Sequence, residues 1–171
     1  MKYIFFFSSI LFIVIFSTCS KKNDDYYMTQ ADKAIQQNDI NGAVQAYQNL
    51  IKEYPQSPKA PEATFKLASF YQNKMVKKEN LSDTLSLEKS AKLYRSIFDQ
   101  FPNDKNAAKS LFMSGFILAN DLKKYNEATA TFVIFLQKFP DNELAFSVRE
   151  ELNNMGLTPS EILDKKKNSN D

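Results

Sequence analysis

Apolar residues recur at helical spacing along most of the chain, in a pattern that is repeated three times. Each repeat ends at an aromatic residue followed by proline: Tyr54-Pro55, Phe101-Pro102 and Phe139-Pro140. Because proline cannot continue a helix, each pair marks the end of an amphipathic run. A small, an aromatic and an apolar residue precede each proline at matching distances: Ala43, Tyr47 and Leu50; Ser90, Tyr94 and Ile97; Ala128, Phe132 and Phe135. This spacing predicts one buried face of a helix, on which the small residue admits a close neighbour.

A second apolar segment precedes each of these helices, so the predicted repeating unit is a pair of helices. The apolar positions of these first helices are Tyr27, Ala31 and Ala34; Thr64, Leu67, Ala68 and Tyr71; and Leu111, Gly115 and Leu118. Self-similarity at this period predicts a solenoid, and the low glycine content favours helices over strands. The second unit carries additional residues within 73–83, expected as an exposed extension that Met75, Val76 and Leu81 would let continue the first helix. The third unit carries one additional residue near Asn120-Asp121.

The residues after Pro140 predict a C-terminal cap. Residues 141–155 are amphipathic, with Leu144, Phe146, Val148 and Leu152 as apolar points, and Gly156 is expected to stop that helix. The sequence Thr158-Pro159-Ser160-Glu161 is a capping box with proline at the first helical position, predicting a last short helix through Leu163. Residues 164–171 are expected to form a flexible tail.

The N-terminal 18 residues have the pattern of a secretory signal. Lys2 precedes the apolar stretch from Ile4 to Phe16, which is too short to cross a bilayer comfortably. Cys19, the only cysteine, follows at once, and this order resembles the lipobox of bacterial lipoproteins, although Phe16 and Thr18 stand where that family prefers leucine and a smaller residue. The resemblance implies acylation of Cys19 and a tether over residues 19–25. The alternative is ordinary signal cleavage near Ser20.

The composition excludes several kinds of chemistry. The chain has no histidine and one cysteine, which leaves no His-based catalysis and no Cys/His zinc site. It has no glycine-rich phosphate loop, and its formal net charge of +2 gives no electrostatic case for nucleic acid. We therefore expect a protein that is not an enzyme, needs no cofactor or metal and binds neither nucleic acid nor a small-molecule substrate.

The repeating unit resembles the tetratricopeptide repeat. With Asp24 as position 1, the family's positions 4, 8, 20, 24, 27 and 32 are occupied without gaps by Tyr27, Ala31, Ala43, Tyr47, Leu50 and Pro55. The resemblance implies an all-α, right-handed solenoid of three helix pairs plus C-terminal capping helices, over residues 26–163. It also implies a protein-binding groove on the first helix of each pair, lined by Met28, Asp32, Gln36, Phe65, Ser69, Gln72, Asn73, Lys109, Phe112, Phe116 and Asn120. The alternative for the three phenylalanines is that they belong to the core.

The stretch from Tyr54 to Ala68 is similar to the periplasmic group of these repeats, in which an aromatic-Pro end leads through a polar residue and serine to an alanine-rich helix. Members of that group include the lipoprotein of the outer-membrane β-barrel assembly complex and the coordinator of the Tol-Pal division system. The resemblance implies a lipid-anchored outer-membrane scaffold that binds peptide segments or periplasmic domains of outer-membrane proteins. The alternative is a cell-division or envelope-remodelling regulator using the same groove. With Ser20 after Cys19, the resemblance to bacterial lipoproteins implies the outer membrane; we expect the periplasmic face, with the cell surface as the alternative.

Overall fold

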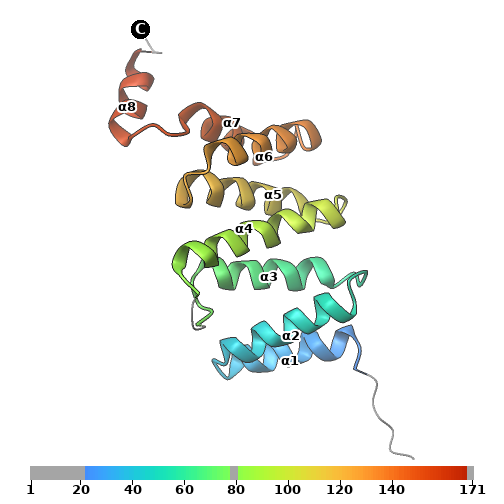
Figure 1. The fold of residues 1–171 in the computed structure, drawn as a ribbon. Helices are drawn as coiled ribbons and strands as arrows, with labels where there is room; N and C mark the ends of the chain where they lie inside the picture. The colour runs from blue at the N-terminus through green and yellow to red at the C-terminus, as the bar shows by residue number, and fades with distance from the viewer. Residues whose placement is uncertain (1–21, 78–80, 169–171) are drawn as a thin grey trace, which may run out of the picture.

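The computed structural model describes residues 22–77 and 81–168, so the expected signal segment and Cys19 lie outside the described residues. The described part of the chain is helical, without strands, and its helices stack in chain order along one direction (Figure 1). They are α1 (Asp24–Gln36), α2 (Ile40–Glu53), α3 (Ala60–Gln72), α4 (Asp83–Gln100), α5 (Ala107–Phe116), the π-helix η1 (Ile117–Asp121), α6 (Tyr125–Lys138), α7 (Ala145–Asn154) and α8 (Pro159–Asn168). The prediction of an all-α solenoid of helix pairs is confirmed. Among these helices, none combines the length and apolarity that a membrane crossing requires.

The core consists of the predicted helix faces. Ala43, Ser90 and Ala128 are fully buried in the three second helices, together with the aromatic residues four positions later. The Ser90 hydroxyl donates a hydrogen bond of 2.8 Å to the carbonyl of Ala68 on the paired helix. A small residue at this point therefore allows the helices of a pair to approach closely, and here the contact also satisfies a buried polar group.

One turn occurs three times, after each aromatic-Pro pair. Its central residue is Ser57, Asp104 or Asn142, whose side-chain oxygen accepts a hydrogen bond from the backbone N–H two residues later, at 3.0, 2.8 and 3.0 Å. The backbone carbonyl of the same residue accepts from the N–H of the alanine that opens the next helix, Ala60, Ala107 or Ala145. Short polar side chains with this bonding are typical of tight turns. The repeated turn gives successive units the same entry into their first helix.

The additional residues of the second unit lengthen α4, not α3. Helix α3 ends at Gln72, whereas α4 begins at Asp83, where the Ser82 side chain accepts from the N–H of Leu85. The expectation that the first helix continues is wrong, because Lys74 adopts a left-handed φ of 55° directly after α3, and Ser82 caps a new helix instead. The expected exposure of this segment holds only in part, because Val76 is buried against the first core cluster.

The single additional residue of the third unit is accommodated as the π-helix η1. The N–H of Leu122 donates to the carbonyl of Ile117, five residues back, at 3.0 Å. A wider turn of this kind takes up one residue without ending the helix. The segment then closes at Lys123, which has a left-handed φ of 56°, as Asn38 and Lys74 do after the first helices of the other two units.

The N-terminal boundary differs from the predicted one. Helix α1 begins at Asp24, capped by the Asn23 side chain, so Asp24 and Asp25 belong to the helix and not to a tether ending at residue 25. The carboxylate of Asp24 accepts a 2.6 Å hydrogen bond from the Ser57 hydroxyl, and Lys59 pairs with Asp25. The first turn of α1 is therefore attached to the turn that follows α2.

The C-terminal cap is divided into two parts. Gly156 adopts a φ of 80° after α7, and the Thr158–Glu161 capping box forms as predicted, with the N–H of Thr158 donating to the Glu161 carboxylate at 2.7 Å. Helix α8 continues through Asn168, so the segment expected as a tail from residue 164 is helical to that point. It turns away from α7 (Figure 1) and is bonded to that helix through Lys165, whose ammonium donates to the carbonyl of Asn153 at 2.7 Å. Phe146 of α7 is 71% exposed and does not contribute to a packed face.

Candidate functional site

The residues predicted to line a groove lie on consecutive first helices, α1, α3 and α5 with η1. Six of them are half-buried: Met28, Phe65, Ser69, Gln72, Phe112 and Phe116. The other five are exposed: Asp32, Gln36, Asn73, Lys109 and Asn120. We call these eleven residues the first-helix surface. None is fully buried, so each side chain reaches solvent in part, and their role in binding stays a prediction.

Phe65 connects this surface to the core. Its ring meets Tyr94 edge-on, with centroids 5.1 Å apart, and Tyr94 is buried on α4. The ammonium group of Lys109, one unit further on, lies 5.2 Å from the Phe65 ring centroid. The structure thus brings together an aromatic and a cationic side chain from α3 and α5, in the arrangement that favours a cation–π contact.

Phe112 and Phe116 form a second aromatic group on α5. Their ring centroids are 6.0 Å apart, and Phe112 lies 6.1 Å from Phe132, which is fully buried on α6. The phenylalanines therefore belong partly to the core and partly to the exposed surface, so neither of the two alternatives describes them completely. Each ring is fixed by a core aromatic or its neighbour on one side and is partly open to solvent on the other.

Several polar members of the surface are bonded within the chain. Asn73 donates to the carbonyl and hydroxyl of Ser69, while Gln72 accepts from the Tyr94 hydroxyl at 3.1 Å. Asn120 donates to the Glu151 carboxylate of α7 at 2.9 Å, which ties the third unit to the cap. These side chains can offer a ligand only their remaining donors and acceptors.

The first unit contributes less to a continuous surface. Met28 packs against the core cluster of α1 to α3, and Gln36 is exposed at the end of α1. Asp32 is linked to α3 through Lys66, 3.8 Å away, which also pairs with Glu62 at 3.3 Å. Lys66 was not among the predicted residues. Its position between Asp32 of α1 and Glu62 of α3 could be recognised only from the fold.

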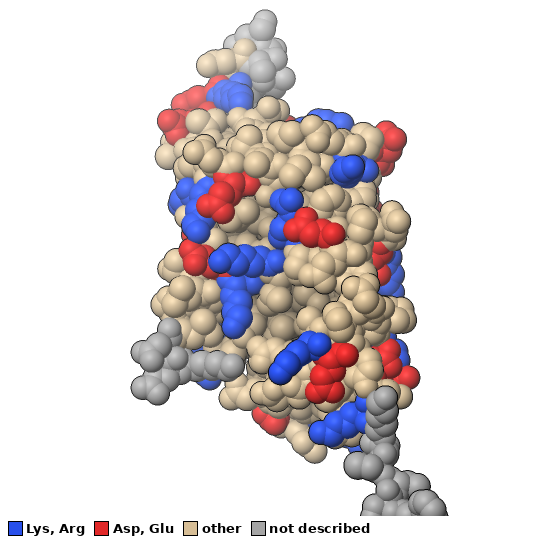
Figure 2. Space-filling model, turned by 45° about the vertical axis from the view of Figure 1, so that its right-hand side comes forward, with Lys and Arg blue, Asp and Glu red and all other residues tan. Residues whose placement is uncertain are grey.

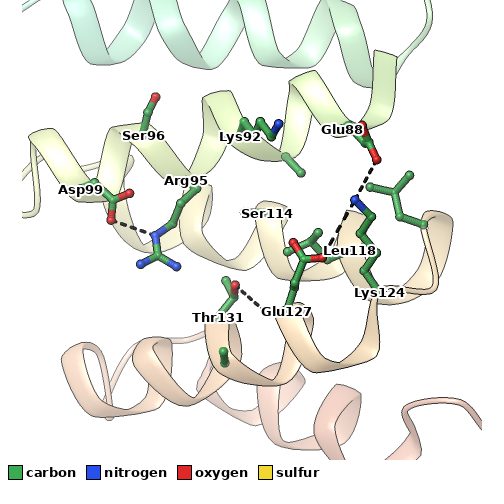
Figure 3. A pocket seen from close by; sticks show the side chains of 13 residues that line it. Glu88, Lys92, Arg95, Ser96, Asp99, Ser114, Leu118, Lys124, Glu127 and Thr131 are labelled. Carbon is green, nitrogen blue, oxygen red and sulfur yellow. Dashed lines mark hydrogen bonds and ion pairs between the residues drawn. The ribbon is translucent and has the colours of Figure 1, made fainter. Parts of the chain in front are cut away.

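A cavity of 470 Å³ lies between the second helices α4 and α6, with α5 and η1 at its floor (Figure 3). We call it the α4–α6 cavity. Ser114 and Leu118 contribute to it from the floor, whereas Phe112 and Phe116 belong to the first-helix surface. Two residues along an α-helix turn the side chain by about 200°, so the two sites lie on opposite sides of α5. The cavity was not predicted from the sequence.

Charged side chains border this cavity. The Lys124 ammonium donates to Glu88 at 2.7 Å and lies 4.0 Å from Glu127, while Arg95 Nε donates to Asp99 at 2.8 Å (Figure 3). The hydrogen bond from Lys124 lowers the pKa of Glu88, and the same bond raises the pKa of Lys124. Both groups are therefore held in their charged forms at neutral pH. On the face drawn in Figure 2, residues of both signs are interspersed and no single-sign patch forms.

Comparison with known proteins identifies one family. Residues 26–57, which cover most of α1, all of α2 and the first turn, match the model of the tetratricopeptide repeat. A search of curated proteins gave no significant match. The chain therefore contains a tetratricopeptide repeat, and its stacked helix pairs form a helical solenoid of the tetratricopeptide type. Domains of this type generally bind other proteins.

Proposed function

We propose that this tetratricopeptide-containing chain is a non-catalytic scaffold of the bacterial outer membrane that binds segments of other proteins on its first-helix surface. The observation that carries the proposal is the set of three half-buried phenylalanines on α3 and α5, Phe65, Phe112 and Phe116, accompanied by Lys109. Aromatic side chains of this kind are common anchors at protein–protein interfaces.

The packing of these rings favours binding. Phe65 rests on Tyr94 and Phe112 on Phe132, so two of the anchors are ordered before any partner arrives. A partner then loses less free energy to ordering the surface than it would with mobile side chains. A peptide that lies across α3 and α5 would cover the exposed sides of the rings and find polar groups of Ser69 and Lys109 beside them.

Attachment to the membrane is the second part of the proposal. It rests on the signal-like N-terminus and on Cys19, to which an acyl group would be added. Only residues 20–23 separate Cys19 from α1, a distance of about 14 Å at full extension. The α1 end of the stack would then stay next to the bilayer, within reach of periplasmic domains of outer-membrane proteins.

A double substitution, Phe65→Ala with Phe112→Ala, tests the binding surface. After crosslinking in cells, the variant should lose the partners that the unchanged chain captures, while its helical circular dichroism and cooperative melting persist. Phe146→Ala and Val133→Ala are matched controls, because these residues are 71% and 42% exposed outside the surface, and they should retain the partners. A folded double variant with unchanged capture would contradict the proposal.

The captured proteins distinguish the two envelope roles. Subunits of the β-barrel assembly machinery would support the assembly scaffold that we propose. Tol-Pal or peptidoglycan-remodelling proteins would instead support the cell-division regulator.

Fractionation tests the location independently of binding. Cys19→Ala should yield an uncleaved or soluble product, and normal processing with membrane association would contradict lipid attachment. Protease treatment of intact cells should leave the protein intact if it faces the periplasm, and should digest it if it faces outward.

A further inference from the structure

The residues that line the α4–α6 cavity are smaller than their counterparts at the preceding junction, where the first and second units meet. Two pairs of positions in adjacent helices show the difference. At the junction of the first and second units, Val44 of α2 and Leu93 of α4 occupy these positions. The residues at the same distances from the repeated small residue at the junction of the second and third units are Ala91 of α4 and Thr131 of α6. In both pairs the residue at the second junction is the smaller one.

The central helices follow the same trend. Leu67 and Tyr71 of α3 correspond to Ser114 and Leu118 of α5 and η1. The Tyr71 ring is fully buried at the first junction, where its hydroxyl accepts from Gln48 at 3.3 Å. Cores are normally packed with few voids, so four smaller residues at one junction leave a hollow that an external group can enter.

The lining of the cavity limits what can enter. Among its thirteen lining residues only four are apolar: Ala91, Leu118, Leu122 and Ala130. This apolar area suits one large side chain better than a long acyl chain, which would need an apolar channel along its length. Ser114 and Thr131 add hydroxyl groups, of which that of Thr131 already donates to the carbonyl of Glu127 at 2.8 Å.

The basic side chains of the cavity wall keep N–H donors that could bind an anion. Each of its three carboxylates, Glu88, Glu127 and Asp99, has a basic partner within 4.0 Å. The basic groups are less occupied, because Lys92 has no ion pair among the described residues and Arg95 bonds Asp99 only through Nε. A guanidinium group has five N–H donors, so four remain on its amino nitrogens.

The orientation of Arg95 directs these donors inward. Its guanidinium group extends from α4 into the space between α4 and α6 (Figure 3). The ring of Phe98 lies 5.8 Å from its Cζ atom and supports it from its own helix. A carboxylate at the mouth of the cavity could accept two parallel hydrogen bonds from this group.

We infer that the α4–α6 cavity is a second protein-binding site, which takes a segment presenting a large apolar side chain beside an acidic one. The apolar side chain enters between Ala91, Leu118 and Thr131, and the carboxylate pairs with Arg95. This site is separate from the first-helix surface, so a scaffold with both could hold two partners at once.

Two-dimensional NMR of the unlipidated chain, residues 20–171, tests the site with defined probes, once its spectrum matches a fully folded protein. The dipeptide acetyl-Glu-Phe-amide should shift the signals of Ala91, Ser114 and Thr131. Acetyl-Glu-Ala-amide and acetyl-Lys-Phe-amide should bind about tenfold more weakly, because one lacks the apolar anchor and the other the charged hydrogen bonds.

Variants taken from the first junction provide the matched controls. Ala91→Val with Leu118→Tyr and Thr131→Leu should fill the cavity and abolish the shifts. If the triple variant does not fold, Thr131→Leu alone replaces it. This substitution removes one hydrogen bond within α6, fills part of the cavity and should weaken binding. Arg95→Gln should remove the preference for Glu-Phe over Lys-Phe. Phe65→Ala with Phe112→Ala should leave the shifts unchanged, which separates this site from the first-helix surface.

Three results would overturn the inference. The first is the absence of cavity shifts with acetyl-Glu-Phe-amide, and the second is equal binding of the Lys-Phe probe to the unchanged chain. The third is stronger binding of decanoate, a single-chain amphiphile, at the same signals, which would identify a lipid site instead.

Discussion

Gly115 of α5 lies against the ring of Phe132 on α6, so closely that a Cβ atom at Gly115 would be 2.5 Å from Cε1 of Phe132. The equivalent residues of the other two units are Ala31 and Ala68, both fully buried. The third pair therefore packs more tightly at this point than a Cβ atom allows, because Phe132 is itself fully enclosed and has little room to move.

Gly115→Ala should destabilise the protein despite the better helix propensity of alanine. Displacing an enclosed ring costs roughly 1–3 kcal/mol, and alanine returns about 1 kcal/mol, so the expected net loss is up to about 2 kcal/mol of unfolding free energy. Urea denaturation measures it. In a Phe132→Leu background the same substitution should cost less, and an equal cost in both backgrounds would show that the ring is not responsible.

Lys123→Gly should stabilise the chain. Lys123 ends η1 with a left-handed φ of 56°, a conformation that costs a side-chain-bearing residue roughly 1 kcal/mol and glycine almost nothing. The expected gain is up to about 1 kcal/mol in urea denaturation, reduced by the greater freedom of glycine in the unfolded chain. Lys52→Gly within α2 is the control and should lose about 1 kcal/mol. A loss at Lys123 would contradict the strain argument.

The capping box of α8 should weaken in acid. Hydrogen bonds from the backbone and hydroxyl of Thr158 lower the pKa of Glu161 below its ordinary value of 4.5. Since the folded-state pKa is depressed, the stabilisation is complete above pH 4.5 and is lost as the pH falls through the lowered pKa. The amide signal of Thr158 and the helical shifts of Ile162 should report this by NMR. Glu161→Gln, which keeps the capping geometry, should remove the pH dependence.

Tyr27 should titrate late in alkali. Its hydroxyl donates to the Glu53 carboxylate at 2.7 Å, and this bond, with burial, raises the pKa of Tyr27 to about 12. A raised pKa means that the contribution to stability is complete below pH 10 and is lost as the pH rises through about 12. Absorbance at 295 nm would follow the phenolate.

Two substitutions check the cause of this shift. Tyr27→Phe should remove one late-titrating group, and Glu53→Gln should move its midpoint toward 10. An unchanged midpoint in Glu53→Gln would rule out the carboxylate as the cause. The absorbance of Tyr94, whose pKa burial raises to about 12, should persist in both variants.

The sequence predicted those parts of the fold that depend on spacing. Tyr47, Tyr94 and Phe132 recur at one position of the repeat, and each is buried as that spacing requires. The length of an insertion carries less information, because it does not say which neighbouring helix receives it. In the structure the second helix received part of the insertion, and the Ser82 side chain caps its start.

The candidate sites were predictable to different degrees. Family positions located Phe65 and Phe112 on the first helices, but their half-burial depends on Tyr94 and Phe132, which lie across the pair. The α4–α6 cavity leaves no motif in any one segment. It becomes visible only when residues such as Tyr71 and Leu118 are compared between junctions, and that comparison requires the packing of three helices.

The π-helix at Ile117–Asp121 has a consequence for how such a chain can change in length. An additional residue in a regular helix rotates every later side chain by about 100°, which would turn a buried face toward water. Here the surplus is confined to one wide turn, and Ile117 and Ala119 stay buried within it. A single-residue insertion in this helix can therefore be tolerated without a change in the packing of the rest of the solenoid.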